Sequence, residues 1–92
     1  MTTNPERKGI KVLVVEDEKP LRDLIREELS RSGYKVETAA DGSEGLFKYG
    51  MELFNVVLLD IRMPGMDGVE VLGRMRYEST LPEVIVLTAT AP

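Results

Sequence analysis

The 92-residue sequence contains neither cysteine nor histidine, and only 5% of its residues are aromatic. Without cysteine, the chain can form neither a disulfide framework nor a thiolate metal site. Without histidine, it has no conventional zinc site and no histidine for acid–base chemistry. These absences exclude several common classes of enzyme and metalloprotein, and they leave oxygen atoms as the metal ligands that the chain can offer.

Long hydrophobic runs are also missing. The longest apolar runs, residues 12–15 and 56–59, are far too short to span a bilayer. Residues 1–8 are polar and lack the apolar centre of a signal peptide. The 12 basic and 16 acidic residues give a net charge of −4, which argues against a general nucleic-acid-binding patch. We therefore expect a cytoplasmic domain with no membrane contact and no nucleic-acid binding of its own.

Three short segments are apolar at nearly every position, namely residues 11–15, 55–61 and 84–87. Such runs are typical of strands that are buried on both faces of a parallel sheet. Residues 34–39 instead alternate in polarity, which predicts a half-exposed strand near a sheet edge.

Helical patterns separate these strands. After Pro20, leucine and isoleucine recur at helical spacing as far as Gly33, which is a natural helix stop. The charged residues from Arg22 to Glu28 are expected to form the solvated face of this first helix. Asp41 and Glu44 resemble a capping box.

The capping box predicts a second helix that extends to about Leu53. Gly45 and Gly50 weaken this prediction, because each costs about 1 kcal/mol relative to alanine inside a helix. A third helix is expected after the cap Asp67. Its apolar residues are Val69, Leu72 and Met75.

The predicted element order is therefore β-α-β-α-β-α-β. Alternation of this kind indicates an α/β fold, with a doubly wound parallel sheet and right-handed crossovers. Residues 1–9 are interpreted as an N-terminal leader and residues 10–92 as a single domain.

The candidate chemistry lies at the carboxyl ends of the strands, where ligands bind in open α/β sheets. The first strand ends in Glu16 and Asp17, the third in Asp60 and the fourth in Thr88. If the first and third strands are neighbours, three carboxylates converge and repel one another unless a cation is present. Each residue also has an ordinary explanation as a helix-start charge, a turn former or a strand residue. Their joint placement favours a Mg²⁺ site with phosphate as a co-ligand.

Three segments resemble motifs of bacterial response-regulator receiver domains. They are residues 12–18 (VLVVEDE), 58–68 (LLDIRMPGMDG) and 84–89 (VIVLTA). The resemblance extends over essentially residues 10–91, with the motifs in the correct order and spacing. It implies a flavodoxin-like fold and a phosphoacceptor signalling module of a two-component system.

The resemblance also implies roles for individual residues. Asp60 would accept a phosphoryl group from a histidine kinase or phosphotransfer protein. The implied metal ligands are Asp17, Asp60, Glu16 (directly or through water) and the main-chain carbonyl of Arg62. Thr88 and the Ala89 amide would bind the phosphoryl oxygens. Such a domain catalyses only its own phosphorylation and dephosphorylation, because the carboxylate is itself the nucleophile.

The other motif residues are interpreted as structural. Pro64, Gly65 and Gly68 are expected to set loop geometry. Met63 and Met66 are expected to pack or to face a partner rather than to bind a metal.

Receiver domains ordinarily continue with a fourth helix, a fifth strand and a fifth helix, which carry a phosphate-binding lysine and a switching aromatic residue. The sequence stops at Pro92, so we expect a receiver that is truncated at its C-terminus and lacks that last helix–strand–helix. The strand at residues 84–87 would then be an apolar sheet edge that invites pairing with another chain.

Two alternatives follow from these features. The first is a non-signalling assembly or folding fragment, which would form a homo-oligomer or a strand-exchanged dimer through the exposed edge. The second is an aspartate-nucleophile phosphohydrolase. Those enzymes need a second aspartate two residues after the nucleophile, where this chain has Arg62, so the second alternative is disfavoured.

Overall fold

The computed structural model describes residues 9–63 and 68–75, and the backbone of residues 84–88. Strands and helices alternate in the predicted order. They are β1 (Lys11–Val15), α1 (Lys19–Arg31), β2 (Lys35–Ala39), α2 (Gly42–Met51), β3 (Val56–Asp60), α3 (Gly68–Met75) and β4 (Val84–Thr88). The boundaries differ from the predictions by a few residues at most; α2, for example, ends at Met51 rather than at Leu53.

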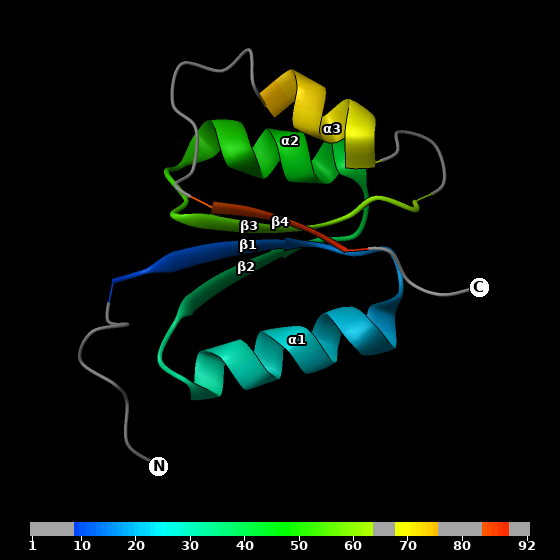
Figure 1. The fold of residues 1–92 in the computed structure, drawn as a ribbon. Helices are drawn as coiled ribbons and strands as arrows, with labels where there is room; N and C mark the ends of the chain where they lie inside the picture. The colour runs from blue at the N-terminus through cyan, green and yellow to red at the C-terminus, as the bar shows by residue number, and fades with distance from the viewer. Residues whose placement is uncertain (1–8, 64–67, 76–83, 89–92) are drawn as a thin grey trace.

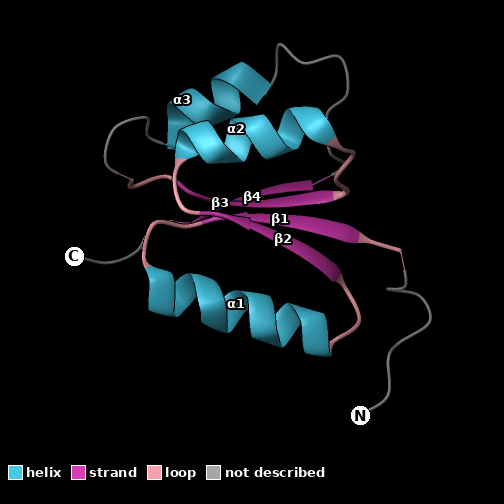
Figure 2. Cartoon of the chain, turned by 180° about the vertical axis from the view of Figure 1, so that it is seen from behind, coloured by secondary structure: helices cyan, strands magenta, loops and turns pink. Residues whose placement is uncertain are grey.

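The strands form one parallel sheet in the order β2-β1-β3-β4. Helix α1 covers one face, and helices α2 and α3 lie together on the other (Figure 1). The view from behind shows the same three layers (Figure 2). The chain therefore crosses from one face of the sheet to the other, which confirms the doubly wound α/β fold. Strand β2 lies at one end of this order, as its alternating sequence predicted.

The two faces of the sheet are covered unequally. The main core lies between the sheet and the pair α2–α3, and its buried residues are Leu13, Val15, Ala39, Tyr49, Phe54, Val57, Leu59, Met63, Val71 and Met75. Val12 and Val14 alternate with these residues along β1 and are also buried, so they face α1. Helix α1 itself contains no buried residue, and Leu24 is 54% exposed.

The helix boundaries follow from local chemistry. Pro20 lies in the first turn of α1, and Gly33 follows the helix with a φ of 104°, which favours glycine. At α2, the Asp41 carboxylate accepts a hydrogen bond from the Glu44 N–H (2.8 Å). The Glu44 carboxylate accepts one from the N–H of Ala40 (2.9 Å), the residue before the cap, so the Asp41 half of the capping box is confirmed, while Glu44 bonds one residue earlier than predicted.

Gly45 has a packing role that its helix propensity conceals. A Cβ atom placed there would lie 2.9 Å from Cγ2 of Val15 on β1. The missing side chain therefore lets α2 approach the sheet closely. Gly45 therefore lowers the helix propensity of α2 but allows the helix to pack more closely on the core.

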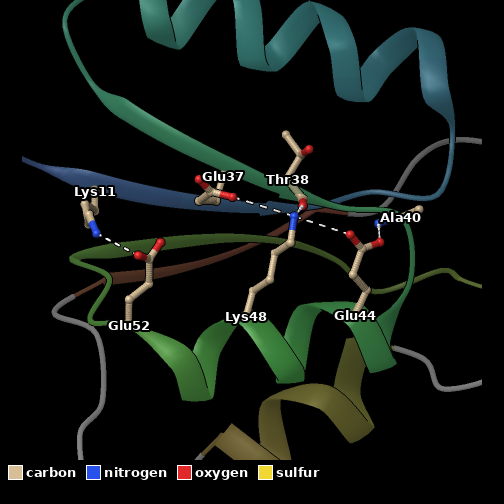
Figure 3. Close-up of polar contacts among 7 residues, drawn as sticks. All are labelled: Lys11, Glu37, Thr38, Ala40, Glu44, Lys48 and Glu52. Carbon is tan, nitrogen blue, oxygen red and sulfur yellow. Dashed lines mark hydrogen bonds and ion pairs between the residues drawn. The ribbon is translucent and has the colours of Figure 1, made fainter.

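Polar side chains tie α2 to the sheet (Figure 3). The ammonium of Lys48 donates to the main-chain oxygen of Thr38 (2.6 Å) and lies 3.3 Å and 3.6 Å from the carboxylates of Glu44 and Glu37. Near the amino end of β1, Lys11 forms a 2.9 Å ion pair with Glu52. We call the Lys11–Glu52 contact the amino-end pair.

Helix α3 buries Val71 and Met75 against the core, whereas Val69 is 64% exposed. Val69 therefore does not contribute to the apolar face of this helix. The proposed cap Asp67 lies outside the described residues. Among the helices that the structure describes, none is long and apolar enough to cross a bilayer.

Candidate functional site

The fold brings three acidic residues together at the carboxyl edge of the sheet. Strands β1 and β3 are parallel neighbours, with Val15 opposite Leu59. Glu16 and Asp17 follow β1, and Asp60 ends β3, so the topology places them at the same edge. One carboxylate oxygen from each of the three residues lies within 4.8 Å of the others. We call Glu16, Asp17 and Asp60 the acidic cluster.

The acidic cluster is largely withdrawn from water. Glu16 is 3% exposed and Asp60 is 2% exposed, whereas Asp17 is partly exposed. Burial raises the pKa of Glu16 from 4.5 to about 7; a hydrogen bond from the Glu18 N–H opposes this rise, and the neighbouring carboxyl groups of Asp17 and Asp60 add to it. Near neutral pH, a negative charge on Glu16 is therefore costly.

Backbone groups orient two of these carboxylates. The Glu18 N–H donates to Oε2 of Glu16 (3.1 Å), and the Arg62 N–H donates to Oδ1 of Asp60 (2.9 Å). The Glu16 N–H donates to the Ala39 oxygen (3.0 Å), which continues the bonding between β1 and β2 past the end of β1. The bonds to Glu16 and Asp60 thus restrict the orientation of their carboxylates.

Gly68 makes the close approach of α3 to the acidic cluster possible. A Cβ atom at this position would lie 2.4 Å from the Ile61 Cα and 2.6 Å from the Asp60 carbonyl oxygen. Gly68 is the first residue of α3, and its N–H donates to the Ile61 oxygen (3.3 Å). The interpretation of Gly68 as a residue that sets loop geometry is therefore wrong. Glycine is needed because the helix starts directly against the backbone of the phosphoacceptor candidate.

The remaining predicted site residues are placed less completely. The backbone of Thr88 pairs with Asp60 across β3 and β4, so Thr88 lies at the edge where the acidic cluster is found. The Arg62 N–H contacts Asp60, while the role predicted for its carbonyl stays a prediction. Ala89 lies outside the described residues, and so do Pro64, Gly65 and Met66. Met63 is buried in the core, which confirms its packing role.

The donor atoms of the acidic cluster fit a hard divalent cation. All three are carboxylate oxygens, which suit Mg²⁺ better than softer transition metals. Mg²⁺ usually takes only one or two carboxylates and keeps several waters, and the partial exposure of Asp17 leaves one side open to solvent. Burial is the main cause of the raised pKa of Glu16, and a cation would offset both this cost and the smaller contribution of the neighbouring carboxyl groups.

Comparison with known proteins identifies the family. The response regulator receiver domain matches residues 12–92, which is almost the whole chain. The chain belongs to the response regulator receiver family. The flavodoxin-like interpretation of the sequence is confirmed, and the acidic cluster is an observed feature of this receiver domain.

Individual relatives support the assignment. The receiver is 47% identical over 79 residues to a probable transcriptional regulator, ycf27, of Cyanophora paradoxa, and 40% identical over 79 residues to the alkaline phosphatase synthesis transcriptional regulatory protein PhoP of Bacillus subtilis. Each match covers 86% of this chain and 33% of the relative, so the chain spans about a third of the length of these curated relatives.

Solved structures agree with this result. The response regulator protein TrrA of Thermotoga maritima, in complex with Mg(2+)-BeF, is 34% identical with a TM-score of 0.72, and the match covers 86% of each chain. The chemotaxis protein CheY4 of Vibrio cholerae is 38% identical with a TM-score of 0.72, and this match covers 90% of the receiver and 72% of CheY4.

Proposed function

We propose that this receiver domain accepts a phosphoryl group on Asp60 and that the acidic cluster holds the Mg²⁺ ion which this transfer requires. The observation that carries the proposal is the convergence of three carboxylates within 4.8 Å at the ends of β1 and β3. The similar receiver TrrA was crystallised with Mg(2+)-BeF, which supports the choice of metal. The donor would be the phosphohistidine of a histidine kinase or of a phosphotransfer protein, in the cytoplasm.

The chemistry follows from the properties of the Asp60 carboxylate. One of its oxygens attacks phosphorus; an O–P bond forms, the P–N bond of the donor breaks, and its electron pair returns to the imidazole. An ionised carboxylate has no proton to lose, so no general base is needed. The Arg62 N–H fixes Oδ1 of Asp60 and thereby restricts the orientation of the carboxylate.

The other groups bind and orient. Mg²⁺, when bound, supplies positive charge that offsets the charge on the phosphoryl oxygens. Asp17 and Asp60 would hold it, with Glu16 acting directly or through water and the Arg62 carbonyl as a further ligand. Thr88 and the Ala89 amide would bind the phosphoryl oxygens, and the pairing of Asp60 with Thr88 across the sheet supports this role for Thr88. New contacts to Thr88 would shift the domain between two conformations.

Intact-mass spectrometry tests the proposal. The chain is incubated with acetyl phosphate and Mg²⁺, and the expected result is the addition of one phosphoryl group. Asp60→Asn and a Mg²⁺-free sample should show none. Asp23→Asn is the matched control, because Asp23 is a half-exposed residue that pairs with Lys19 on the outside of α1, and this variant should be modified normally. A folded wild-type chain that gains no mass would contradict the proposal.

An assembly role is the second candidate. Strand β4 is the last strand in the described order, and an apolar strand at an edge can pair with another chain. Analytical ultracentrifugation would show whether the chain forms a homo-oligomer. Self-association that is unchanged by Mg²⁺ and by acetyl phosphate, in a chain that gains no phosphoryl group, would favour this candidate over signalling.

A further inference from the structure

One residue, Arg22, binds the backbone of the whole segment that carries two members of the acidic cluster. Its main-chain N–H donates to the Glu18 oxygen (2.9 Å) as part of helix α1. Its guanidinium Nη1 donates to the Glu16 oxygen (2.9 Å) and also contacts the Asp17 oxygen (3.4 Å). The carbonyl oxygens of residues 16, 17 and 18 are therefore all bonded to Arg22.

The other arginines of α1 behave differently. Arg26 lies 3.9 Å from Asp23, and Arg31 pairs with Glu27 and Glu28, all within the same helix. These are surface contacts of the kind expected for a solvated helix face. The sequence pattern places Arg22 on that face, but its side chain is half-buried and points back towards the end of β1. The interpretation of Arg22 as a solvated residue is therefore wrong.

The position of these hydrogen bonds gives them a specific consequence. Residues 16–18 follow the last residue of β1, so the regular strand pairing no longer fixes all of their peptide planes. Rotation of those planes would redirect the side chains of Glu16 and Asp17, and repulsion within the acidic cluster favours such a rotation. A guanidinium bonded to both carbonyls opposes it, because its planar group donates several hydrogen bonds in a fixed geometry.

We propose that Arg22 is a positioning residue for the cation site: it holds the β1–α1 segment so that the carboxylates of Glu16 and Asp17 face Asp60. Arg22 acts on the main chain of the ligands and touches neither the cation nor the phosphoryl group. This inference rests on the proposed function and adds a residue to it.

Whether removal of the Arg22 guanidinium raises or lowers the affinity for Mg²⁺ distinguishes a positioning role from a purely electrostatic one. Arg22 carries a positive charge close to the acidic cluster, so removal of that charge alone would strengthen Mg²⁺ binding. Loss of the positioning contacts would instead weaken it. Substitution of a residue that orients metal ligands typically lowers metal affinity by about 10- to 100-fold.

Isothermal titration calorimetry with Mg²⁺ on the full 92-residue chain tests the proposal. Arg22→Met keeps the aliphatic stem and removes the guanidinium, and it should raise the Kd for Mg²⁺ about 10-fold. Arg26→Met, one turn further along the same helix, removes the same charge and should leave the Kd near the wild-type value. Arg22→Lys should recover only part of the affinity, because its ammonium can donate to these carbonyls but lacks the fixed planar geometry of the guanidinium.

Backbone NMR on the metal-free variants supplies a readout that does not depend on the cation. Arg22→Met should shift the amide signals of residues 16–18 and of Asp60 while those of α2 stay in place. A Kd for Arg22→Met equal to or below that of the wild type would overturn the positioning role and leave the proposed function intact. A wild-type chain that binds no Mg²⁺ would overturn both. Shifts throughout the domain would show a general role in folding and would also overturn the proposal.

Discussion

The two ends of strand β1 carry charges in opposite arrangements. At the amino end, Lys11 and Glu52 form a pair of opposite charges 2.9 Å apart, and about a third of each side chain is exposed. At the carboxyl end, Glu16 and Asp60 lie almost fully buried beside Asp17, so charges of the same sign are collected. The pair of opposite charges at the amino end is the arrangement expected of a contact that stabilises the fold. The buried carboxylates at the carboxyl end lower the stability of the folded state, which is typical of a binding site.

This difference has a direct consequence for stability. A partly exposed ion pair such as Lys11–Glu52 contributes little, about 0.5 kcal/mol. Buried charges of the same sign are costly until a cation or a proton neutralises them. The comparison therefore predicts that the response of this receiver to pH, Mg²⁺ and mutation is concentrated at the carboxyl end.

The largest expected effect is the pH dependence of the metal-free protein. The pKa of Glu16 is raised on folding, from 4.5 to about 7, so the folded state binds a proton that the unfolded state releases. The contribution of Glu16 to stability is thus fully present below pH 4.5 and is lost as the pH rises to about 7. The loss is about 3 kcal/mol. Chemical denaturation with a chelator present measures it.

Two controls sharpen this pH prediction. Glu16→Gln should remove most of the decline, because the residue no longer ionises. Glu44→Gln should leave the decline in place, since the pKa of Glu44 is lowered by the Ala40 N–H and its contribution has the opposite sign. Saturating Mg²⁺ should also suppress the decline. A metal-free chain whose stability rises steadily between pH 4.5 and 7 would contradict the account of the cluster.

A larger residue at Gly68 should disrupt the site at the carboxyl edge of the sheet through a steric clash. In Gly68→Ala, the added Cβ would overlap the backbone of Asp60 and Ile61, and we expect a loss of about 2 kcal/mol. Mg²⁺ affinity should fall as well, because the Asp60 backbone must move. Gly73→Ala is the matched control on the same helix: nothing lies within 4 Å of its Cβ, so this variant should be slightly stabilised. Thermal unfolding compares the two, and equal stabilities would refute the steric explanation.

Lys48 tests the polar contacts on the α2 side of the sheet. Lys48→Met removes the donor to the Thr38 oxygen and the nearby charge for Glu37 and Glu44. We expect a loss of about 1 kcal/mol in urea unfolding, with Mg²⁺ affinity unchanged. Lys19→Met, which breaks an exposed ion pair, should have almost no effect. A large change in Mg²⁺ affinity for Lys48→Met would show that the two regions are coupled.

The smallest effect is expected at the amino-end pair. Lys11→Met should cost about 0.5 kcal/mol at low salt and less at high salt, because exposed pairs are screened. Neither the affinity for Mg²⁺ nor the phosphorylation of Asp60 should change. Urea titrations at two salt concentrations measure the effect. If Lys11→Met destabilised the chain as much as Gly68→Ala does, the contrast between the two ends would be lost.

The sequence predicts the fold and the acidic cluster well because both depend on local patterns. Buried strands appear as continuous apolar runs, and the acids that follow β1 and β3 are visible as strand-end residues. Parallel pairing then brings Glu16 and Asp60 to one edge without further information. The cap at Asp41 is readable for the same reason, since it spans only a few residues.

The contacts that the sequence does not predict are those that join residues of different helices, strands or loops. Gly68 gives no sign that it must fit against Ile61, and Gly45 gives none that it packs on Val15. Arg22 lies among the charged residues of α1, so its pattern is that of a solvated face. Its contact with the Glu16 carbonyl depends on where helix α1 starts relative to β1, which only the structure shows.

The most direct test of the central claim is to locate the phosphoryl group by chemical trapping. The chain is treated with acetyl phosphate and Mg²⁺ and then with sodium borohydride, which reduces an acyl phosphate to an alcohol and converts the modified aspartate to homoserine. Peptide mass spectrometry then identifies the residue. We expect homoserine at position 60 alone, and only when Mg²⁺ is present. Homoserine at any other position, or none in a folded chain, would contradict the central claim.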